Sequence, residues 1–479
     1  MNEPSEISFP AAEAPAPRRA KPSQLNSLGS IVLLLALVYF GYTAKTANVV
    51  QTCLGLLILV GAALPSLLWA KRADFRFPVF EVFMLTGINT YAIPLLSGHS
   101  QLAAYSEDTI TKSAFAILLF QIVANLVYGA TTGQPKRSPN WTQEVVSRHI
   151  TDYLAYGMAV TTIYTVLSGF TDWIPQDLNS VLRAVCFGIG IISTFIQARM
   201  WGEGTLPHHR KGIFIFQLFL QVFFSWAALF LIGGLSILVL ALLGYVSGGK
   251  KIPFLALAVV LPVVAVLHNG KSLMRDKYWE GHAPKPTITE LPAFFNEWID
   301  CGLQPAEQQS TVRESPRVLD RTSLFHMLCL VVSLTPDLQP YLEGETYAFV
   351  PGQFIPSFFW KGKPPAHIAT NTLSVYYGLQ VMEATVKTTI AFGLLTEAYA
   401  NFGLFGMGLI GGLFSFCFKK FGCWAANSPM LSYPGLVLIV LMAWSFQAEL
   451  TFAAWIGSLY QACFVVLGIP FIIRNFLGE

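Results

Sequence analysis

Charged side chains are scarce in this chain: they make up 12% of its 479 residues, against about 25% in ordinary soluble domains. Hydrophobic residues make up 54%, and the mean hydropathy is +0.54. A soluble fold of this size could not bury so much apolar surface, whereas a lipid bilayer accommodates it directly. The composition therefore excludes an ordinary soluble protein and predicts an all-α polytopic membrane protein.

Several features of well-known protein classes are also missing. The net charge is only +3, so nucleic-acid binding has no electrostatic support. The motifs GxxxxGK[ST], GxGxxG, HExxH and GxSxG do not occur, and without the first of them ATP-driven transport through a P-loop in this chain is excluded. The seven cysteines show no metal-ligand or disulfide spacing, and His208-His209 lacks a carboxylate partner. We expect neither a metal nor a cofactor.

Long apolar stretches dominate the rest of the chain, and several approach the roughly 20 residues that cross a bilayer as a helix. The run from Ile213 to Val246 is too long for one span, and Gly233-Gly234 lies in its middle, so we divide it into a helical hairpin. This gives about twelve transmembrane helices. They cover residues 28–44, 50–70, 78–97, 110–131, 151–169, 179–198, 213–231, 233–247, 252–267, 401–418, 431–448 and 455–473.

The distribution of Lys and Arg predicts the orientation, because cytoplasmic loops are enriched in both. With the N-terminus in the cytoplasm, most basic residues fall in internal segments, and the short external segments contain only Lys45, Lys112 and Arg183. We therefore expect a multi-pass protein with both termini cytoplasmic. One alternative stays open: if 213–247 were a single kinked span and 324–338 a true span, residues 268–321 would be cytoplasmic.

Four regions follow from this organisation. Residues 1–24 form a Pro-rich disordered tail, and residues 25–267 form a bundle of about nine transmembrane helices. Residues 268–387 form a large external loop, and residues 388–479 form a bundle of about three more. The external loop contains an amphipathic helix at Pro292–Cys301, expected on the membrane surface, and a short apolar stretch, Leu324–Leu334, expected to be re-entrant or interfacial.

The residues from Thr335 to Thr372 combine many aromatic side chains with charges, which a simple linker does not need. Aromatic rings such as Tyr347 and Trp360 can stack on sugars. Lys361 and Lys363 could neutralise phosphate. Glu345 could accept a proton from a hydroxyl group. The other interpretation is an interfacial belt, because aromatic residues and lysines also gather where a loop touches lipid headgroups.

Other candidates flank this segment. Glu397 immediately precedes an apolar run, where a carboxylate is costly, so it is either functional or an interfacial residue facing water. Lys271 and Arg275 are four residues apart and would share a helix face, where they could grip a diphosphate or anchor the chain to the membrane surface. Arg321 precedes the short apolar stretch, and His367 follows the lysines.

The order of these features resembles the oligosaccharide repeat-unit polymerases, the O-antigen-polymerase-like proteins of bacterial envelopes. The specific part covers about residues 317–410, roughly a fifth of the chain. The matching residues are an Arg before a short apolar helix, then Thr335-Pro336, Tyr341-Leu342-x-Gly344-x-Thr346-Tyr347, Ile355-Pro356, Lys363-Pro364, and Glu397-Ala398-Tyr399-x-Asn401-Phe402-Gly403-x-x-Gly406. Many members have Arg after the Ile-Pro pair, where this chain has Ser357.

The resemblance implies a membrane-glycosyltransferase-like fold and a substrate, a glycan on undecaprenyl diphosphate at the external face of the bacterial cytoplasmic membrane. It implies repeat-unit polymerisation for O-antigen or exopolysaccharide, without metal, with Glu397 or Glu345 as base. The expected substrate-binding residues are Arg321, Lys363, Lys361, Arg275, Lys271, Trp360, Tyr347, Tyr399 and His367. By charge type and location, we expect Arg321, Lys363 and Arg275 to contact the diphosphate. Membrane lipid and a separate chain-length regulator are candidate partners. A lipid-linked glycan flippase and a non-catalytic component of an envelope-glycan or protein-sorting complex are the alternatives.

Overall fold

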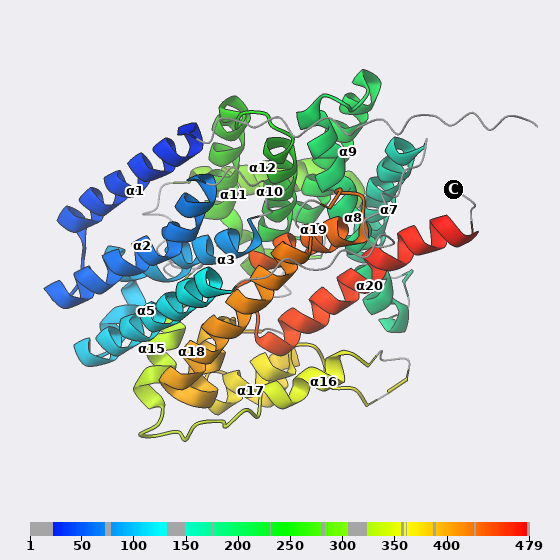
Figure 1. Ribbon diagram of the computed structural model, residues 1–479. Helices are drawn as coiled ribbons and strands as arrows, with labels where there is room; N and C mark the ends of the chain where they lie inside the picture. The colour runs from blue at the N-terminus through cyan, green and yellow to red at the C-terminus, as the bar shows by residue number, and fades with distance from the viewer. Residues whose placement is uncertain are drawn as a thin grey trace, which may run out of the picture.

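All regular elements in the described part of the chain are helices (Figure 1). The computed structural model describes residues 23–71, 78–131, 149–171, 173–174, 176–229, 231–278, 283–284, 286–304, 323–355, 359–360, 362–386, 389–425 and 428–476. The longer helices are α1 Ser23–Thr43, α2 Val49–Lys71, α3 Val79–Gly87, α4 Ile93–Ser97, α5 Glu107–Ala130, α7 Ile150–Phe170, α8 Gln176–Glu203, α9 His208–Ala227, α10 Leu231–Ser247, α11 Phe254–Tyr278, α12 Leu291–Leu303, α15 Phe325–Leu334, α16 Val350–Gln353, α17 Ile368–Tyr376, α18 Gly393–Trp424, α19 Tyr433–Ser445 and α20 Phe452–Phe476. The prediction of an all-α fold is confirmed for these residues.

Seven helical segments of the described chain are long and apolar enough to cross a membrane, which makes this a polytopic membrane protein. They are Asn26–Thr43, Val49–Lys71, Val79–Ser97, Glu107–Ala130, Val185–Glu203, Phe254–Tyr278 and Gly393–Trp424. Shorter apolar helices occur at Leu231–Ser247, Phe325–Leu334, Tyr433–Ser445 and Phe452–Gly468. Seven is fewer than the predicted twelve, although every predicted span coincides with a helix of the structure.

The main hydrophobic core lies where α2, α3, α5, α15, α18, α19 and α20 meet, and α8 joins it through Phe195 and Ile196. The segment that contains α15, α16 and α17 gathers at one end of this bundle, at the lower edge of Figure 1. The N-terminal ends of α2 and α5 lie toward the same end, since Val50 and Thr111 line one cavity with Thr335 and Asp337, the residues that follow α15. This end is the one that the sequence predicts to be external.

The predicted hairpin between residues 213 and 247 exists, but its turn lies earlier than the two glycines. Helix α9 ends at Ala227, and Leu229 has a φ of +57°, while its N–H donates to the Trp226 carbonyl at 2.7 Å. Gly234 lies inside α10, where a Cβ would come within 2.3 Å of the Trp226 indole nitrogen. The glycine therefore permits close helix packing and does not form the turn.

The short apolar stretch forms α15, which is buried among larger helices. The Leu324 N–H donates to the Thr90 carbonyl at 3.0 Å, in the π-helical segment Ile88–Ala92 inside the third candidate span. Helix α15 then packs against α5 and α18 and ends at Leu334, with Thr335 as its C-cap. An entry at this depth is the geometry of a re-entrant segment.

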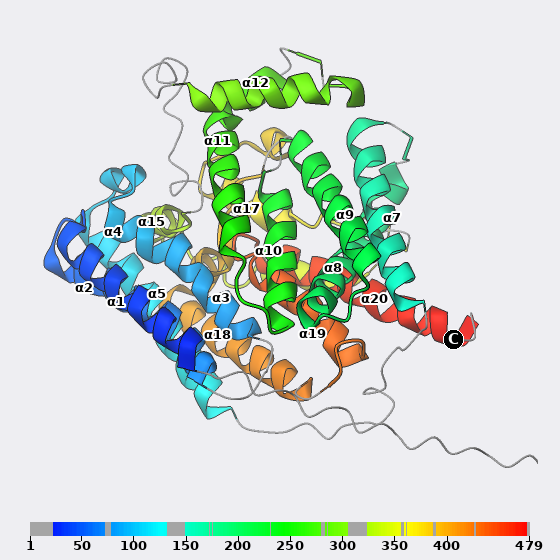
Figure 2. The same ribbon diagram turned by 90° about the horizontal axis from the view of Figure 1, so that it is seen from above.

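The predicted amphipathic helix is α12, which lies across the end of α11 in Figure 2. Its apolar face packs against protein: Trp298 is fully buried and donates to the Leu267 carbonyl at 2.6 Å. Phe295 stacks on Phe223 of α9 with ring centroids 4.6 Å apart. Neighbouring helices therefore cover much of the face that the sequence assigned to the membrane surface.

Candidate functional site

Asn401 is the centre of a buried polar cluster that joins two distant segments of the chain. Its Oδ1 accepts from the Gly344 N–H at 3.0 Å. Its Nδ2 donates to the Thr346 hydroxyl and to the Glu397 carbonyl, both at 2.8 Å. Asn401, Thr346 and Glu397 are all fully buried. We call these three residues and Gly344 the Asn401 cluster.

Backbone contacts hold the same two segments together. The N–H groups of Leu342 and Glu343 donate to the carbonyls of Ala400 and Asn401, at 3.0 and 3.2 Å. The loop bends sharply here, since Glu343 and Gly344 have φ values of +48° and +98°. The left-handed region is accessible to glycine without steric cost, so the second position needs glycine most strongly.

Helix α18 is broken beside the cluster, and the break explains two glycines of the motif. Gly403 has a φ of +57°, and a Cβ there would lie 2.7 Å from the Tyr341 hydroxyl. At Gly406 a Cβ would lie 2.1 Å from the Ala398 carbonyl oxygen, a distance that no side chain tolerates. The two motif segments that resemble repeat-unit polymerases thus fit against each other at the kink.

The aromatic residues of the loop pack largely against the helices. Tyr347 stacks on Phe402 with centroids 6.1 Å apart and an interplanar angle of 10°, and it meets Phe452 edge-on at 5.9 Å. Burial, followed by the charge of Glu397, raises the pKa of Tyr347. Tyr399 is mostly buried, with its ring 6.4 Å from that of Tyr341. Both rings support the loop against the bundle.

Glu397 is fully buried, and its carboxylate meets the N-terminus of α20. Oε2 accepts from the Phe452 N–H at 2.5 Å, which satisfies one of the free donors at that helix end. Within the described chain, Oε1 is buried and accepts no hydrogen bond. Glu397 therefore links α18 to α20 from inside the bundle.

Glu345 differs from Glu397 because it is exposed on the outer side of the loop. Its charge reaches Tyr376: burial, and then Glu345, raise the pKa of that phenol. The Tyr376 hydroxyl donates to the Pro340 carbonyl at 2.8 Å, so α17 and the loop are joined next to the carboxylate. Of the two predicted bases, Glu345 is the one in contact with solvent.

Lys363 points toward its own loop. Its Nζ donates to the carbonyls of Gln353 and Ile355 at 3.2 and 2.8 Å, which uses two of its three N–H donors. Partial burial lowers its pKa. Trp360 lies against Gly352 and remains 40% exposed, so its ring is available to a ligand. Lys361 and Arg321 lie outside the described residues.

His367 is exposed at the start of α17, close to a cation that sequence reasoning missed. Burial by neighbouring atoms, and then the charge of Arg183 on α8, lower the pKa of His367. No motif surrounds Arg183 in the sequence. Its place among the three basic residues of the short external segments was the signal that could have drawn attention to it.

Lys271 and Arg275 lie on one helix, α11, as their spacing predicts. Arg275 donates to the Leu229 carbonyl at 3.0 Å and so holds the turn between α9 and α10. Figure 1 places α12, and with it this end of α11, away from α15 and α17. The structure does not bring this pair to the Asn401 cluster.

The chain offers no obvious place for a metal: in the described ranges, no three His, Cys, Asp or Glu side chains stand close enough to bind one. The site instead combines a buried carboxylate, an exposed carboxylate, aromatic rings and cations at one end of a helical bundle. Comparison of the chain with protein-family models, with curated proteins and with solved structures finds no match.

Proposed function

We propose that this chain is a membrane glycosyltransferase that polymerises lipid-linked oligosaccharide repeat units. The observation that supports it best is the union of the two motif segments, Tyr341–Tyr347 and Glu397–Gly406, through the Asn401 cluster. Residues 344 and 401 are far apart in sequence, and nothing in a simple membrane anchor requires this contact. Functional centres are typically held in place by such hydrogen bonds between buried side chains and backbone.

The proposed topology has twelve spans and both termini in the cytoplasm of a bacterium, with the chain in the cytoplasmic (inner) membrane. Seven helices of suitable length support it, as do helices at all the other predicted spans. Residues from about 338 to 387 are then external. This side suits an undecaprenyl-diphosphate donor, whose activated glycosyl bond makes ATP unnecessary.

The proposed reaction transfers a glycan from its lipid carrier to a hydroxyl group of another repeat unit. The hydroxyl oxygen attacks the anomeric carbon, the bond from that carbon to the diphosphate oxygen breaks, and the lipid diphosphate leaves with the electron pair. A carboxylate, Glu345 or Glu397, takes the hydroxyl proton; Glu345 is exposed, whereas Glu397 is fully buried. Such general-base catalysis contributes about 10²–10⁴-fold.

Cations must stabilise the charge that develops on the leaving diphosphate. Arg183 lies near His367, and Lys363 lies in the same loop segment as Trp360. The proposal adds Arg321 and Lys361. Because Lys363 also holds two loop carbonyls, its charge and the conformation of the loop are coupled. Lys271 and Arg275 are not part of the proposed site, because they lie on α11 and Arg275 donates to the Leu229 carbonyl.

The test is a complementation series in a deletion strain, at matched membrane levels of each variant. We expect Arg321→Ala, Lys363→Ala and Glu345→Gln to shorten surface glycan toward single repeat units. Lys250→Ala, which removes a cation from the opposite end of the bundle, is the matched control and should restore full length. Normal polymer with all three variants would refute the proposed site.

A further inference from the structure

A cavity lies beside α18, close to the Asn401 cluster, because Tyr399 and Leu404 of this helix line it. Its volume is about 520 Å³, within the range of about 300–1,000 Å³ that is common for ligand pockets. Its walls come from α2, α5, the end of α15, the residues after it, and α18. Tyr399 and Leu404 of α18 face it from either side of the helix break.

One side of this cavity is apolar and open toward the lipid. Val50, Leu54, Phe115 and Leu404 form this side. Val50 and Phe115 are at least half exposed, and Leu404 is 43% exposed, although all three lie on candidate spans. Apolar side chains exposed at membrane depth contact hydrocarbon chains. The opening therefore admits a chain that enters sideways from the bilayer.

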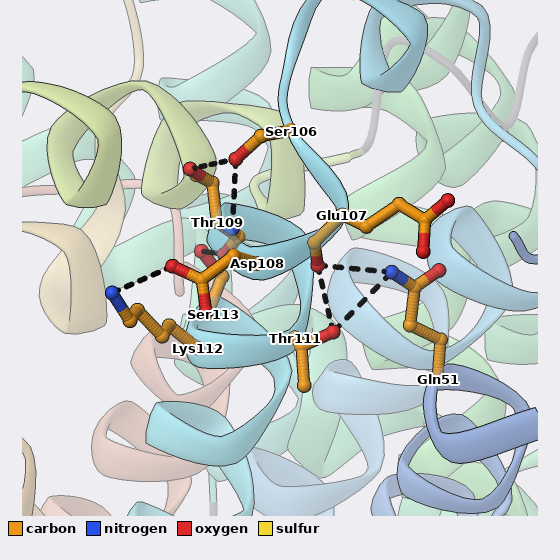
Figure 3. Close-up of polar contacts among 8 residues, drawn as sticks. All are labelled: Gln51, Ser106, Glu107, Asp108, Thr109, Thr111, Lys112 and Ser113. Carbon is orange, nitrogen blue, oxygen red and sulfur yellow. Dashed lines mark hydrogen bonds and ion pairs between the residues drawn. The ribbon is translucent and has the colours of Figure 1, made fainter. Parts of the chain in front are cut away.

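The mouth of the cavity is polar and contains more acids than bases. Lys112 is paired with Asp108 at 2.6 Å, and both side chains are more than 60% exposed (Figure 3). Asp337 lines the same mouth, is exposed, and interacts electrostatically with Lys112. Two carboxylates, Asp108 and Asp337, thus accompany one lysine, whereas the neighbouring Glu107 points away and accepts from Asn48 Nδ2 at 3.0 Å (Figure 3). A ligand with only negative charge would be repelled by this arrangement.

The pair of Lys112 and Asp108 is weak enough to rearrange around a ligand, because exposed ion pairs are strongly screened by water. A phosphate could then approach Lys112, and an ammonium group could donate to Asp337 or Asp108. A lipid headgroup with both a phosphate and an ammonium group would pair with the lysine and with the carboxylates at the same time. The diphosphate of a lipid-linked glycan has more negative charge and lacks the ammonium group, so it fits this mouth less well.

We propose that this cavity binds one phospholipid of the outer leaflet that has a primary amine in its headgroup. The ammonium group lies at Asp337, the phosphate at Lys112, and one acyl chain runs along Val50, Phe115 and Leu404. The lipid would fill the space between α5 and α18 and so support the kink that presents the Asn401 cluster. The proposal does not depend on glycosyl transfer and can fail or succeed separately from it.

The experiment measures which phospholipid the full-length chain retains. The purified protein is placed in nanodiscs that contain equal amounts of phosphatidylethanolamine and phosphatidylglycerol with identical acyl chains, then transferred to detergent. Native mass spectrometry counts the lipid that stays bound. We expect one phosphatidylethanolamine per chain, retained about 10-fold over phosphatidylglycerol, since a bond to a charged group is worth about that factor. Phosphatidylcholine, which has no ammonium N–H, should be retained less well.

Variants separate the headgroup from the chain. Asp337→Asn is an exposed substitution that should abolish the preference, and Leu404→Trp should block the chain and lower retention of every phospholipid. Lys45→Ala removes another exposed cation at the same end of the bundle and should leave the preference intact. Equal retention of phosphatidylglycerol, or a preference that survives Asp337→Asn, would overturn the proposal. Retention of a lipid-linked glycan in place of any phospholipid would overturn it too.

Discussion

Replacing Asn401 by alanine should loosen the loop between α15 and α18 from the bundle. The substitution removes three hydrogen bonds, to the Gly344 N–H, the Thr346 hydroxyl and the Glu397 carbonyl. Each buried bond contributes about 0.5–1.5 kcal/mol net, so the expected loss is roughly 1.5–4.5 kcal/mol. The actual value should lie in the upper half of this range, because the fully buried Thr346 hydroxyl would lose its Asn401 donor.

The assay compares unfolding free energies and limited proteolysis of residues 335–392 in detergent. Asn296→Ala is the matched control, because the same substitution falls on an exposed position of α12. We expect the Asn401 variant to unfold earlier and to be cut faster within the loop, and the Asn296 variant to behave as the unmodified chain. Equal stability and equal cleavage rates for both variants would refute the reasoning that the cluster joins the two segments.

Three further predictions follow from the same region. Gly403→Ala should destabilise the fold by about 1–2 kcal/mol or more, from its left-handed φ and the 2.7 Å contact with a tyrosine hydroxyl. Gly412→Ala should be tolerated, because its Cβ would lie 3.8 Å from Val123 and Val127, an ordinary contact distance; thermal unfolding distinguishes the two variants. Glu397→Gln should keep an acceptor for the α20 N–H and fold normally, while Glu397→Leu should lose about 1–3 kcal/mol. If Glu397→Gln folds normally and also polymerises glycan, then Glu397 is not the base. A reporter fused after Lys363 should be external in intact cells, and one fused near Gln308 decides the side of residues 268–321; a cytoplasmic signal after Lys363 would overturn the topology.

Hydrophobic runs predict helices well here, because a membrane helix satisfies its own backbone and needs only local sequence. The run at 401–418 illustrates the limit. The helix begins earlier, at Gly393, and breaks at Phe402 and Gly403, where the chain leaves helical geometry. The break exists because Leu342 and Glu343 dock there, and a contact between segments so distant in sequence is invisible to a local pattern.

The sequence predicts which residues belong to the candidate site, but it does not predict their burial or their hydrogen-bond partners. The order of the motif residues identifies Glu397 and Tyr347 as candidates, but their packing depends on Phe452 of α20, which is distant in sequence. Its charge makes Arg275 a candidate ligand for the diphosphate, yet its guanidinium donates to the Leu229 carbonyl in the turn between α9 and α10. The motif contains Asn401 but does not distinguish it from its neighbours, although its side chain makes three of the hydrogen bonds that hold the region together.

The central claim, that this chain polymerises lipid-linked repeat units, is tested most directly by reconstitution. The purified full-length protein is mixed in detergent with undecaprenyl-diphosphate-linked repeat units, and the glycan products are separated by length. The account predicts a ladder of polymer with release of the lipid diphosphate, and single units only for Glu345→Gln. Unchanged single units with the unmodified protein would contradict it, and translocation in sealed vesicles without polymer would identify a flippase instead.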